Sequence, residues 1–485
     1  MEKAECKEDY WIICRNCKGD GKKRKNLRKK TRLHYQTVLD QFQKTDCKGT
    51  APVAPIGEIR TCLKCKGSGL VHSTSKSIVN KENYPHVAII GGGIGGVALG
   101  VACLHRGIPF TLYERDGSFD TRSQGYGLTL QQASKALKGF GITSLKEGIT
   151  STRHVVHTTD GKNIGEWGVR KWGRPDTKKS PKHTNIHIAR QSLRLALLEQ
   201  LGGYNAVKWG HQLLSFNESK NESVTLKFKV KNEIKNAQAD LVVGADGIRS
   251  TVRKLLIGED ITPLHYLGCI VILGICPLKN LEGIESSLLD SATVFQTANG
   301  NERIYMMPYN SDSIMWQLSF PLSEQKAKEL NIAGTKALKE EAGRRTQWHN
   351  PIPQIVSATS EAQISGYPVY DRELLKPQLL KKGTKVTLIG DAAHPMSPFK
   401  GQGANQALLD SLSLARGISK QCTPLHKWRE DGIRKSVLTE FEAEMLARSA
   451  SKVTSSAEAA HLLHSEIVLH EGNGPRGKYR NKTEA

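Results

Sequence analysis

Residues 86–116 read HVAIIGGGIGGVALGVACLHRGIPFTLYERD, and this stretch decides the fold class. HVAII (86–90) is an apolar run typical of a buried strand, and GGGIGG (91–96) follows it as a glycine turn. VALGVACLHRG (97–107) is expected to be a helix with a glycine cap, and IPFTLYERD (108–116) to be the next strand. This order predicts a βαβ unit and therefore an α/β fold built on a parallel sheet.

The glycines of this turn fit the spacing G-x-G-x-x-G at Gly91, Gly93 and Gly96. In a βαβ unit they permit a tight turn, the close approach of a pyrophosphate and tight helix packing. Glu114 ends the second strand, where a carboxylate can accept hydrogen bonds from an adenosine ribose. A membrane span is the alternative because residues 87–104 carry no charge, but six of those eighteen residues are glycine, so we expect no span.

A second glycine-rich turn, GDAAHPMSPFKGQGAN (390–405), lies between an apolar run and an amphipathic stretch, which predict a strand and a helix. Asp391 offers a carboxylate to a sugar-like hydroxyl, and Gly401 and Gly403 let backbone N–H groups approach a ligand. His394, in the same turn, is expected to be structural rather than a general base. A glycine-rich connection without any ligand remains the alternative.

A third segment, ADLVVGADGIRSTVRKLL (239–256), predicts a strand, a tight turn at Asp246 and Gly247, and a helix capped by Ser250. In this order the three segments resemble the class A flavoprotein monooxygenases, the para-hydroxybenzoate hydroxylase-like family that includes phenol hydroxylases and tetracycline-modifying enzymes. The resemblance covers about residues 85–470. It implies a Rossmann-like FAD-binding domain with an inserted antiparallel-sheet substrate domain.

Two further matches extend the resemblance. IHIARQSLRLALLEQL (186–201) is similar to the family's arginine segment, which implies that Arg190 lies near the flavin diphosphate. RSQGYGLTL (122–130) is similar to the stretch that passes the flavin, and its Arg122 matches an arginine that can contact the nicotinamide cofactor. Either arginine could instead be a surface cation. The candidate cofactor-binding residues are Gly91, Gly93, Gly96, Glu114, Arg115, Arg122, Arg190, Asp246, Gly247, Asp391, Pro398, Gly401, Gly403 and Asn405.

The resemblance implies that FAD carries the chemistry. NADPH or NADH would reduce the flavin, O2 would add at its C4a carbon, and the resulting hydroperoxide would hydroxylate an aromatic or polycyclic molecule. No protein nucleophile is required, so we nominate no catalytic side chain. Two other functions stay open: a flavoprotein oxidase or reductase without oxygen insertion, and a binding protein that uses its N-terminal module on a retained flavin fold.

Substrate choice is expected to come from residues 262–375. Four runs of β-forming residues separated by turn residues predict an antiparallel sheet there; they are 265–278, 291–300, 301–310 and 312–322. Alternation along the last run places one set of side chains on a core face, namely Ile314, Trp316, Leu318 and Phe320. The other face provides the candidate substrate residues, which are Tyr305, Met307, Met315 and Gln317.

The first 80 residues do not fit that fold. CRNCKGDG (14–21) and CLKCKGSG (62–69) are two copies of C-x-x-C-x-G-x-G, which resembles the cysteine-rich zinc module of Hsp40-type chaperones. The four thiolates of one structural zinc ion would come from Cys14, Cys17, Cys62 and Cys65. Reducible thiol pairs or unused cysteines are the alternative.

Between the two cysteine motifs lies KKRKNLRKKTR (22–32), in which eight of eleven residues are basic. Residues 1–80 hold 18 Lys and Arg against 8 Asp and Glu, which is +10 of the formal +23. This stretch predicts either a contact with nucleic acid or another acidic partner, or a solvated basic loop. The missing aromatic interleaving favours the solvated loop.

Composition bounds the remaining classes. The chain has 485 residues with 38% apolar content, enough for two or three domains. Acidic residues at the N-terminus and no apolar run there predict no secretory signal and a cytoplasmic location. The expected boundaries are a zinc module at 1–70, a linker at 71–84, an FAD-binding domain at 85–261 and 376–423, a substrate-domain sheet at 262–375, C-terminal helices at 424–470 and a disordered tail at 471–485.

Overall fold

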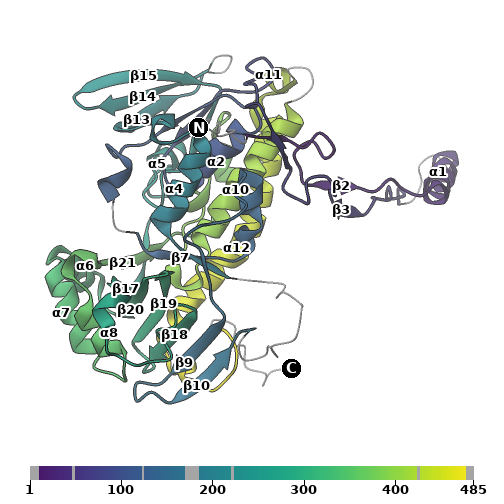
Figure 1. Cartoon of the computed structure of the whole chain (residues 1–485). Helices are drawn as coiled ribbons and strands as arrows, with labels where there is room; N and C mark the ends of the chain where they lie inside the picture. Colours follow the sequence, from purple (N-terminus) through teal and green to yellow (C-terminus); the bar gives the residue numbers. More distant parts are fainter. Residues whose placement is uncertain are drawn as a thin grey trace, which may run out of the picture. The chain divides into compact units, whose positions relative to one another are not determined.

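The computed structural model describes residues 10–45, 50–122, 125–169, 185–219, 223–422 and 427–476. The chain forms two compact units, Met1–Ile78 and Val79–Ala485, which we call the N-terminal unit and the body. Figure 1 shows the helices and strands of both.

The N-terminal unit contains two short antiparallel ribbons and one helix. Strand β1 (Tyr10–Ile13) pairs with β4 (Leu70–Ser73), and β2 (Lys22–Arg24) pairs with β3 (Ile59–Thr61). Helix α1 (Lys29–Lys44) has no buried residue. Because β4 pairs with β1, residues 71–73 belong to this unit and not to the predicted linker. At the other end of that linker, the Asn80 N–H donates to Gly107 O at 2.8 Å and Tyr84 is buried, so both belong to the body.

The body is built on a five-stranded parallel sheet in the order β12-β6-β5-β16-β22. Its strands are Val207–Lys208, Phe110–Tyr113, Val87–Ile90, Leu241–Gly244 and Val386–Leu388. The predicted βαβ unit is present, with helix α2 (Ile94–Leu104) between β5 and β6. Helix α2 packs against α4 (Arg190–Leu201) and α10 (Gly403–Gln421) (Figure 1).

No helix in the described ranges is long and apolar enough to cross a membrane. The uncharged stretch that suggested such a span folds instead as β5, the glycine turn and α2.

A second, seven-stranded sheet has the order β10-β9-β18-β19-β20-β17-β21. Its strands are Asn163–Trp167, Arg153–His157, Thr293–Ala298, Arg303–Asn310, Ser313–Pro321, His265–Pro277 and Ile364–Asp371. Every neighbouring pair is antiparallel except β9 and β18. The predicted substrate sheet at 262–375 was therefore incomplete, because β9 and β10 come from residues 153–167.

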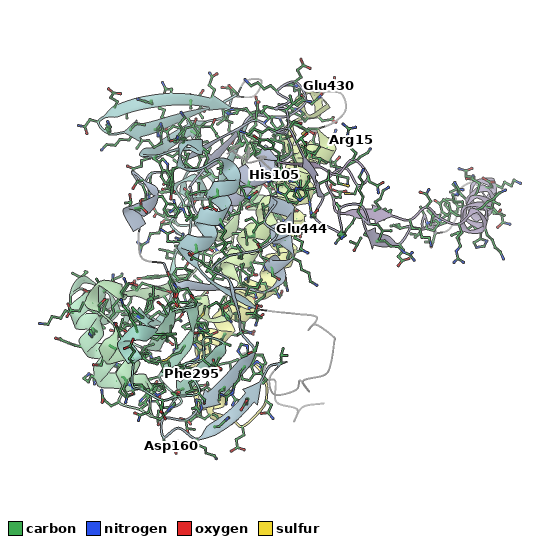
Figure 2. All side chains as sticks on the ribbon, viewed as in Figure 1. Arg15, His105, Asp160, Phe295, Glu430 and Glu444 are labelled. Carbon is green, nitrogen blue, oxygen red and sulfur yellow. The ribbon has the colours of Figure 1, made fainter. Side chains whose placement is uncertain are left out.

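One face of this sheet carries an apolar core. The four residues predicted to share a core face of β20 all lie in it, together with Phe295 of β18, which is fully buried (Figure 2). Helices α7 (Thr335–Arg345) and α8 (Ile352–Ala358) contribute side chains to the same core, and α6 (Glu324–Ile332) contributes Ala327. These helices cover the face of the sheet opposite to the candidate substrate residues.

The end of the described chain lies along β10. Gly472 N–H donates to Ile164 O at 2.9 Å, and Arg476 Nη2 donates to the same oxygen at 2.9 Å. The Glu166 N–H donates to Asn473 Oδ1 at 3.1 Å. The predicted disordered tail at 471–485 is corrected for residues 471–476, because these bonds satisfy backbone groups of an edge strand. The remainder of that tail lies outside the described residues.

The other elements are smaller. Two three-stranded sheets are formed by β7 (Gly127–Leu130), β11 (Ile186–Ala189) and β8 (Ile149–Thr150), and by β13 (His211–Asn217), β14 (Val224–Val230) and β15 (Glu233–Ala239). The remaining α-helices of the described ranges are α5 (Thr251–Ile257), α9 (Pro377–Leu380), α11 (Lys427–Asp431) and α12 (Thr439–Leu462). The short 3-10 or π turns are η1 (Phe119–Arg122), η2 (Gln132–Ser134), η3 (Ala136–Phe140), η4 (Tyr204–Ala206), η5 (Leu278–Leu281), η6 (Glu361–Gln363), η7 (Gly390–Ala392), η8 (Pro398–Lys400), η9 (Arg434–Leu438) and η10 (Glu466–Leu469).

Candidate functional site

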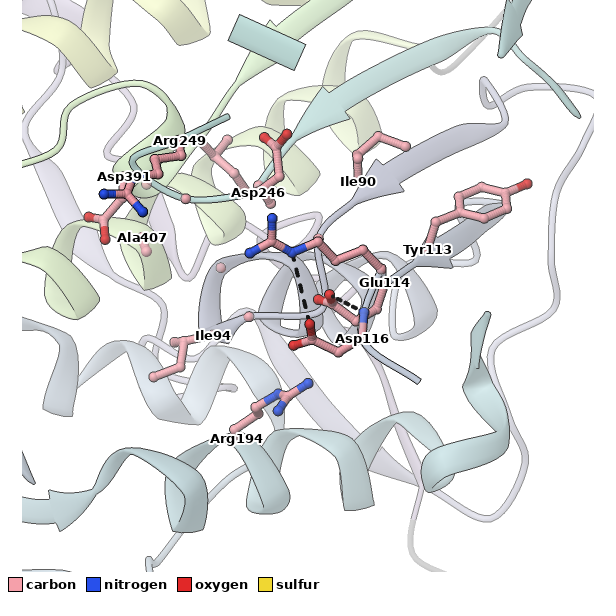
Figure 3. Close-up of a pocket in the computed structure, with 18 of the residues that line it drawn as sticks. Ile90, Ile94, Tyr113, Glu114, Asp116, Arg194, Asp246, Arg249, Asp391 and Ala407 are labelled. Atoms are coloured by element: carbon pink, nitrogen blue, oxygen red, sulfur yellow. Dashed lines mark hydrogen bonds and ion pairs between the residues drawn. The ribbon is translucent and has the colours of Figure 1, made fainter. Parts of the chain in front are cut away.

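An open cleft lies at the carboxyl ends of β5, β6, β16 and β22, where ligands bind in open parallel sheets (Figure 3). Its empty volume, which includes the open space at its mouth, is about 1210 Å³. Nine of the predicted cofactor-binding residues line it: Gly91, Gly93, Glu114, Arg115, Arg190, Asp246, Gly247, Asp391 and Gly403. Sequence reasoning missed other lining residues, among them Tyr126, Arg194 and Arg249.

The three glycines of the first turn have different roles. A Cβ on Gly96 would lie 1.8 Å from Gly91 O, and one on Gly91, which has φ +110°, would lie 2.5 Å from Ala245 O. Both positions therefore require glycine for backbone packing. Gly93 faces the cleft instead, because among the described residues outside its own helix and chain neighbours only Arg190 Nη2, at 3.9 Å, lies within 4 Å of its Cβ position.

Helix α2 begins directly after Gly93, and no side chain caps its N-terminus. The first N–H groups of a helix lack partners within the helix and carry partial positive charge, so this end can accept an anion. Arg190 adds a cation on the cleft wall. Arg194 holds the turn from behind, since its Nε donates to Gly92 O at 2.7 Å and its guanidinium stacks on Phe119.

Glu114 lies opposite that helix end. Its Oε2 accepts from Gly92 N–H at 2.6 Å. Its Oε1 accepts from Asp116 N–H at 3.0 Å, which is one of the dashed lines in Figure 3. A carboxylate has about four acceptor sites, so it can still accept hydrogen bonds from a ligand. Arg115 is largely exposed and forms an ion pair with Asp116 at 3.9 Å.

The carboxylate of Asp246 forms hydrogen bonds within the protein. Its carboxylate accepts from the Ser250 hydroxyl and from the N–H groups of Thr251 and Val252, at the start of α5. Burial raises the pKa of Asp246, although these hydrogen bonds oppose the shift. Ser250 is the N-cap, as predicted, and accepts from Arg253 N–H at 2.9 Å. Asp246 thus positions the turn. No described residue apart from its chain neighbours lies within 4 Å of the Cβ position of Gly247, the next residue.

In the second turn Asp391 is exposed to the cleft, and the residues behind it are buried. Asp410 accepts from Gly390 N–H at 2.8 Å, from His394 Nε2 at 2.7 Å and from Arg448 Nη2 at 2.8 Å. Burial alone would lower the pKa of His394, but the Asp410 carboxylate raises it. His394 is 2% exposed and lies behind the turn, which agrees with its predicted structural role.

Three other predicted residues of this turn do not line the cleft: Pro398, Gly401 and Asn405. Asn405 stays a predicted cofactor residue, but its side-chain amide bonds to the protein. Its Oδ1 accepts from the N–H groups of Gln131 and Ala133, and its Nδ2 donates to the carbonyls of Thr129 and Gly401. All four hydrogen-bonding positions of the amide are therefore used.

Two further arginines differ in how they relate to the sequence predictions. Arg253, which was not predicted, holds the second turn because its Nη1 donates to Ala392 O and Ala393 O, each at 2.9 Å. The side chain of Arg122, predicted to contact the nicotinamide cofactor, lies outside the described residues.

The four candidate substrate residues share one face of the seven-stranded sheet. Tyr305 pairs with Gln317, and Met307 pairs with Met315. Both methionines are 2% exposed and fill the space beside Gly127, whose N–H contacts Met315 Sδ at 2.9 Å. Tyr305 and Gln317 are half-buried, so the accessible part of this face lies toward them.

Sequence reasoning missed polar residues on the same face. Arg303 and Ser319 pair across β19 and β20 and are 5% and 0% exposed. Arg303 lies two residues before Tyr305, so the alternation that identified Tyr305 could have identified it as well. Burial raises the pKa of Tyr305, while Arg303 and Thr129 oppose that shift, and Thr129 lies beside Gly401 in the second turn.

The N-terminal unit brings its four motif cysteines together. All four are buried, and their sulfur atoms lie within 4.8 Å of one another. Cys17 Sγ is 3.6 Å from Cys65 Sγ, and Cys14 Sγ is 4.0 Å from Cys62 Sγ. Four sulfurs at about 2.3 Å from one zinc ion in a tetrahedron would be about 3.8 Å apart, so the cluster has the dimensions of a zinc site.

The glycines of the two motifs explain how the sulfurs converge. A Cβ on Gly21 would lie 2.2 Å from Gly67 O, and one on Gly69 would lie 2.2 Å from Gly19 O. The two knuckles therefore pack backbone against backbone, which only glycine allows. The Gly21 and Gly69 N–H groups also donate to Cys17 Sγ and Cys65 Sγ, at 3.2 and 3.3 Å.

Comparison with known proteins relates the body to FAD-binding proteins. A family model described as FAD binding domain matches residues 84–425. The aurachin C monooxygenase/isomerase of Stigmatella aurantiaca is 29% identical over 334 residues, covering 69% of this chain and 80% of that protein. The 3-amino-4-hydroxybenzoate 2-monooxygenase PtmB3 of Streptomyces platensis is 28% identical, covering 69% and 79%.

Solved structures share the fold. HpxO of Klebsiella pneumoniae, complexed with FAD and uric acid, superposes with a TM-score of 0.62 at 20% identity, covering 78% of this chain and 88% of that one. The 2,6-dihydroxypyridine-3-hydroxylase of Arthrobacter nicotinovorans gives 0.63 at 17% identity, covering 81% and 98%.

Proposed function

This chain belongs to the family described as FAD binding domain, and from that premise we propose that it hydroxylates an aromatic or polycyclic small molecule with NADPH or NADH and O2. It is an FAD-dependent oxidoreductase of the monooxygenase class. The observation that carries the proposal is the cleft at the carboxyl ends of the parallel strands, with an uncapped helix end, a cation and a free acceptor around it.

The residues of this cleft fit FAD. The open N-terminus of α2 and Arg190 would hold the diphosphate, and the free acceptor positions of Glu114 would receive the adenosine ribose. Asp391 would accept hydrogen bonds from the ribityl chain, beside Gly403 at the start of α10. Bound flavin supplies the redox and oxygen chemistry, which amino-acid side chains cannot provide.

The protein's own contribution is to position the reactants and to exclude water. The face of the seven-stranded sheet that carries Tyr305 and Gln317 lies toward β7, as the contact between Gly127 N–H and Met315 Sδ indicates, and β7 in turn is bonded to Asn405 of the second turn. A substrate held there would lie between the sheet and the turn. The relatives named for 3-amino-4-hydroxybenzoate and for 6-hydroxynicotinate support an aromatic substrate.

Absorbance and product analysis test this proposal. We expect the purified protein to show flavin bands near about 375 and 450 nm, at once or after FAD is added. Substrate should stimulate NAD(P)H consumption, and with ¹⁸O2 one labelled oxygen atom should enter the product. Hydrogen peroxide without labelled product would favour the alternative of an oxidase or reductase, and no flavin uptake at all would exclude both.

We also propose that the four cysteines of the N-terminal unit bind one structural zinc ion. This proposal is supported by the spacing of the sulfur atoms and by two backbone N–H groups that donate hydrogen bonds to sulfur. Metal analysis of the full chain should find one zinc per protein. Reversible oxidation of the cysteines without bound metal would favour thiol pairs instead.

The basic stretch at 22–32 is proposed as a weak contact for nucleic acid or another acidic partner. In its support, Lys22, Lys23 and Arg24 on β2 are all exposed. If the stretch is only a solvated loop, the full chain should be retained on an anionic matrix no more strongly than the body alone. A cytoplasmic location is proposed on the metal-type spacing of the cysteines, which suits a reducing compartment.

A further inference from the structure

Helix α1 of the N-terminal unit carries an apolar stripe along one side. Four residues at the spacing i, i+3, i+4 and i+7 form it, and at 3.6 residues per turn they fall within an arc of about 100°; they are Tyr35, Val38, Leu39 and Phe42. Each is half-buried, and no residue of α1 is buried. None of the four belongs to a hydrophobic cluster of the described residues. A stripe of this width ordinarily faces a protein core, and α1 has none.

The remaining surface of α1 is polar, with one exception. Gln36 Nε2 donates to Asp40 Oδ1 at 2.7 Å, and the Thr37 hydroxyl donates to Leu33 O at 3.0 Å, so these polar side chains bond within the helix. The exception is Leu33, which is 58% exposed and lies on the side opposite to the stripe. The stripe is therefore a distinct apolar face, and Leu33 is a lone apolar side chain outside it.

A dense group of cations lies at the N-terminal end of the stripe. All eight are exposed; they are Lys22, Lys23, Arg24, Lys25, Arg28, Lys29, Lys30 and Arg32. Residues 22–32 include no acidic residue, and among the described residues none of the eight forms an ion pair. Around the helix axis Arg32 adjoins one edge of the stripe, while Lys29 and Lys30 lie about 80° beyond its two edges. The cations thus flank the apolar face on both sides.

This combination has the chemistry of a helix that lies on an anionic membrane surface. The apolar side chains of such a helix enter the boundary between headgroups and acyl chains, and its long cationic side chains extend to the headgroups. Each cation near an anionic surface strengthens binding by about fivefold. In α1 and the residues before it, the apolar face and the cations belong to one continuous segment.

The stripe favours a lipid surface over other acidic partners. Nucleic acid is bound through cations and through aromatic side chains that stack on bases. Val38 and Leu39, in the middle of the stripe, are aliphatic and cannot stack in this way. A second copy of this chain would bring eight further cations to the same surface, and like charges oppose association. An anionic lipid surface complements both the apolar face and the charge.

We propose that α1 and the basic stretch at 22–32 bind this protein to an anionic lipid surface. The helix would lie in the plane of the surface, with its stripe toward the acyl chains. This site is separate from the cleft of the body and does not depend on the oxidation proposed there. It narrows the acidic partner of the basic stretch to lipid.

Co-sedimentation of the full chain with sucrose-loaded vesicles tests the proposal. One kind of vesicle contains phosphatidylcholine alone, and the other contains about 30% phosphatidylserine as the anionic lipid. We expect binding to the mixed vesicles, little binding to the neutral ones, and weaker binding as the salt concentration rises. Binding to neither kind, or equal binding to both, would overturn the proposal.

Two variants of the same helix test the apolar face. Leu39→Gln combined with Phe42→Gln removes half of the stripe and should lower the partition onto mixed vesicles by at least about tenfold. The control Leu33→Gln, on the opposite side, should leave the partition unchanged. Because no residue of α1 is buried, both proteins should keep the wild-type circular dichroism spectrum and melting temperature. No loss in the stripe variant, or an equal loss in the control, would overturn the proposal.

A competition experiment separates lipid from nucleic acid. Single-stranded RNA is added to the vesicle-bound chain at the same concentration of phosphate charge as the mixed vesicles present. We expect the chain to remain on the vesicles, because RNA offers nothing to the aliphatic part of the stripe. Release of the chain by RNA would assign the basic stretch to nucleic acid and overturn the proposal.

Discussion

The N-terminal unit and the body use glycine in the same way and gain stability in opposite ways. In the body, Gly91 and Gly96 bring a turn against neighbouring backbone, and the apolar residues of the sheet and its helices hold it there. In the N-terminal unit, Gly21 and Gly69 bring two knuckles together, but the buried cluster consists of four cysteines with Val71 beside them. The body can rely on hydrophobic burial, whereas we propose that the N-terminal unit depends on a metal ion bound by its sulfurs.

Removing one sulfur should therefore have the largest effect of any single change, and only in the N-terminal unit. Structural zinc contributes roughly 10–16 kcal/mol to small metal domains, so Cys14→Ser should lose the ion and unfold residues 10–78. Limited proteolysis should then cleave this unit while the body keeps its flavin spectrum. The control Cys47→Ser, outside both motifs, should retain zinc and resist cleavage. Equal protease resistance in the two variants would contradict a metal-dependent unit.

The matching change in the body is Gly96→Ala. The new methyl group would lie 1.8 Å from Gly91 O, a backbone atom that cannot move without displacing the turn. We expect a loss of about 3 kcal/mol in the free energy of unfolding, together with loss of FAD binding, measured by urea unfolding and flavin absorbance.

Gly343→Ala in α7 is its control, because nothing lies within 4 Å of that Cβ position. This half-buried helical site should gain about 1 kcal/mol from the better helix former. A Gly96→Ala protein that still binds FAD would show that the turn does not depend on this contact.

Acid should weaken the body through buried histidines. Burial lowers the pKa of His187, which is 0% exposed, to about 3 and that of His154 to about 4. The unfolded chain takes up a proton near pH 6.5, so the stability from each neutral imidazole is complete above that pH and declines as pH falls toward 3 to 4.

The free energy of unfolding should fall with pH by up to about 1.4 kcal/mol per pH unit for each such histidine. Urea unfolding of the body at pH 7, 6 and 5 measures it, and His187→Asn should flatten the curve. An unchanged slope in that variant would assign the acid sensitivity to other groups.

Changes to the basic residues of the N-terminal unit are expected to have the smallest effect on stability. Replacing Lys22, Lys23 and Arg24 by Gln should change the free energy of unfolding by less than about 0.5 kcal/mol, because all three are exposed. Retention on heparin and its salt dependence should fall, since fewer cations contact the matrix.

The control for that change removes three exposed lysines from the body, namely Lys326, Lys336 and Lys381. It alters net charge by the same amount. Equal loss of retention in both triple variants would mean that the basic stretch acts only through total charge.

The features that sequence reasoning predicted depend on neighbours in the chain. The strand and glycine pattern at 86–96, the two cysteine knuckles and the alternation along 314–320 are set by residues a few positions apart. The structure therefore reproduces β5, α2 and the core face of β20. For the same reason Ser250 was recognised as a helix cap.

The features that were missed depend on contacts distant in sequence. Asn405 bonds to Gln131, 274 residues away, and no local pattern shows that its amide is already used. The pairing of β9 with β18 joins residues of the first domain segment to the substrate sheet.

The segment that lies along β10 has a consequence for the solubility of this protein. Its residues Gly472, Asn473 and Arg476 meet the backbone of an edge strand, and a Cβ on Gly165 would lie 2.1 Å from Gly472 O. A chain truncated after Leu469 would leave these backbone groups without partners and open to strands of other copies. Self-association after such a truncation would arise from one exposed strand rather than from a failure of the body to fold.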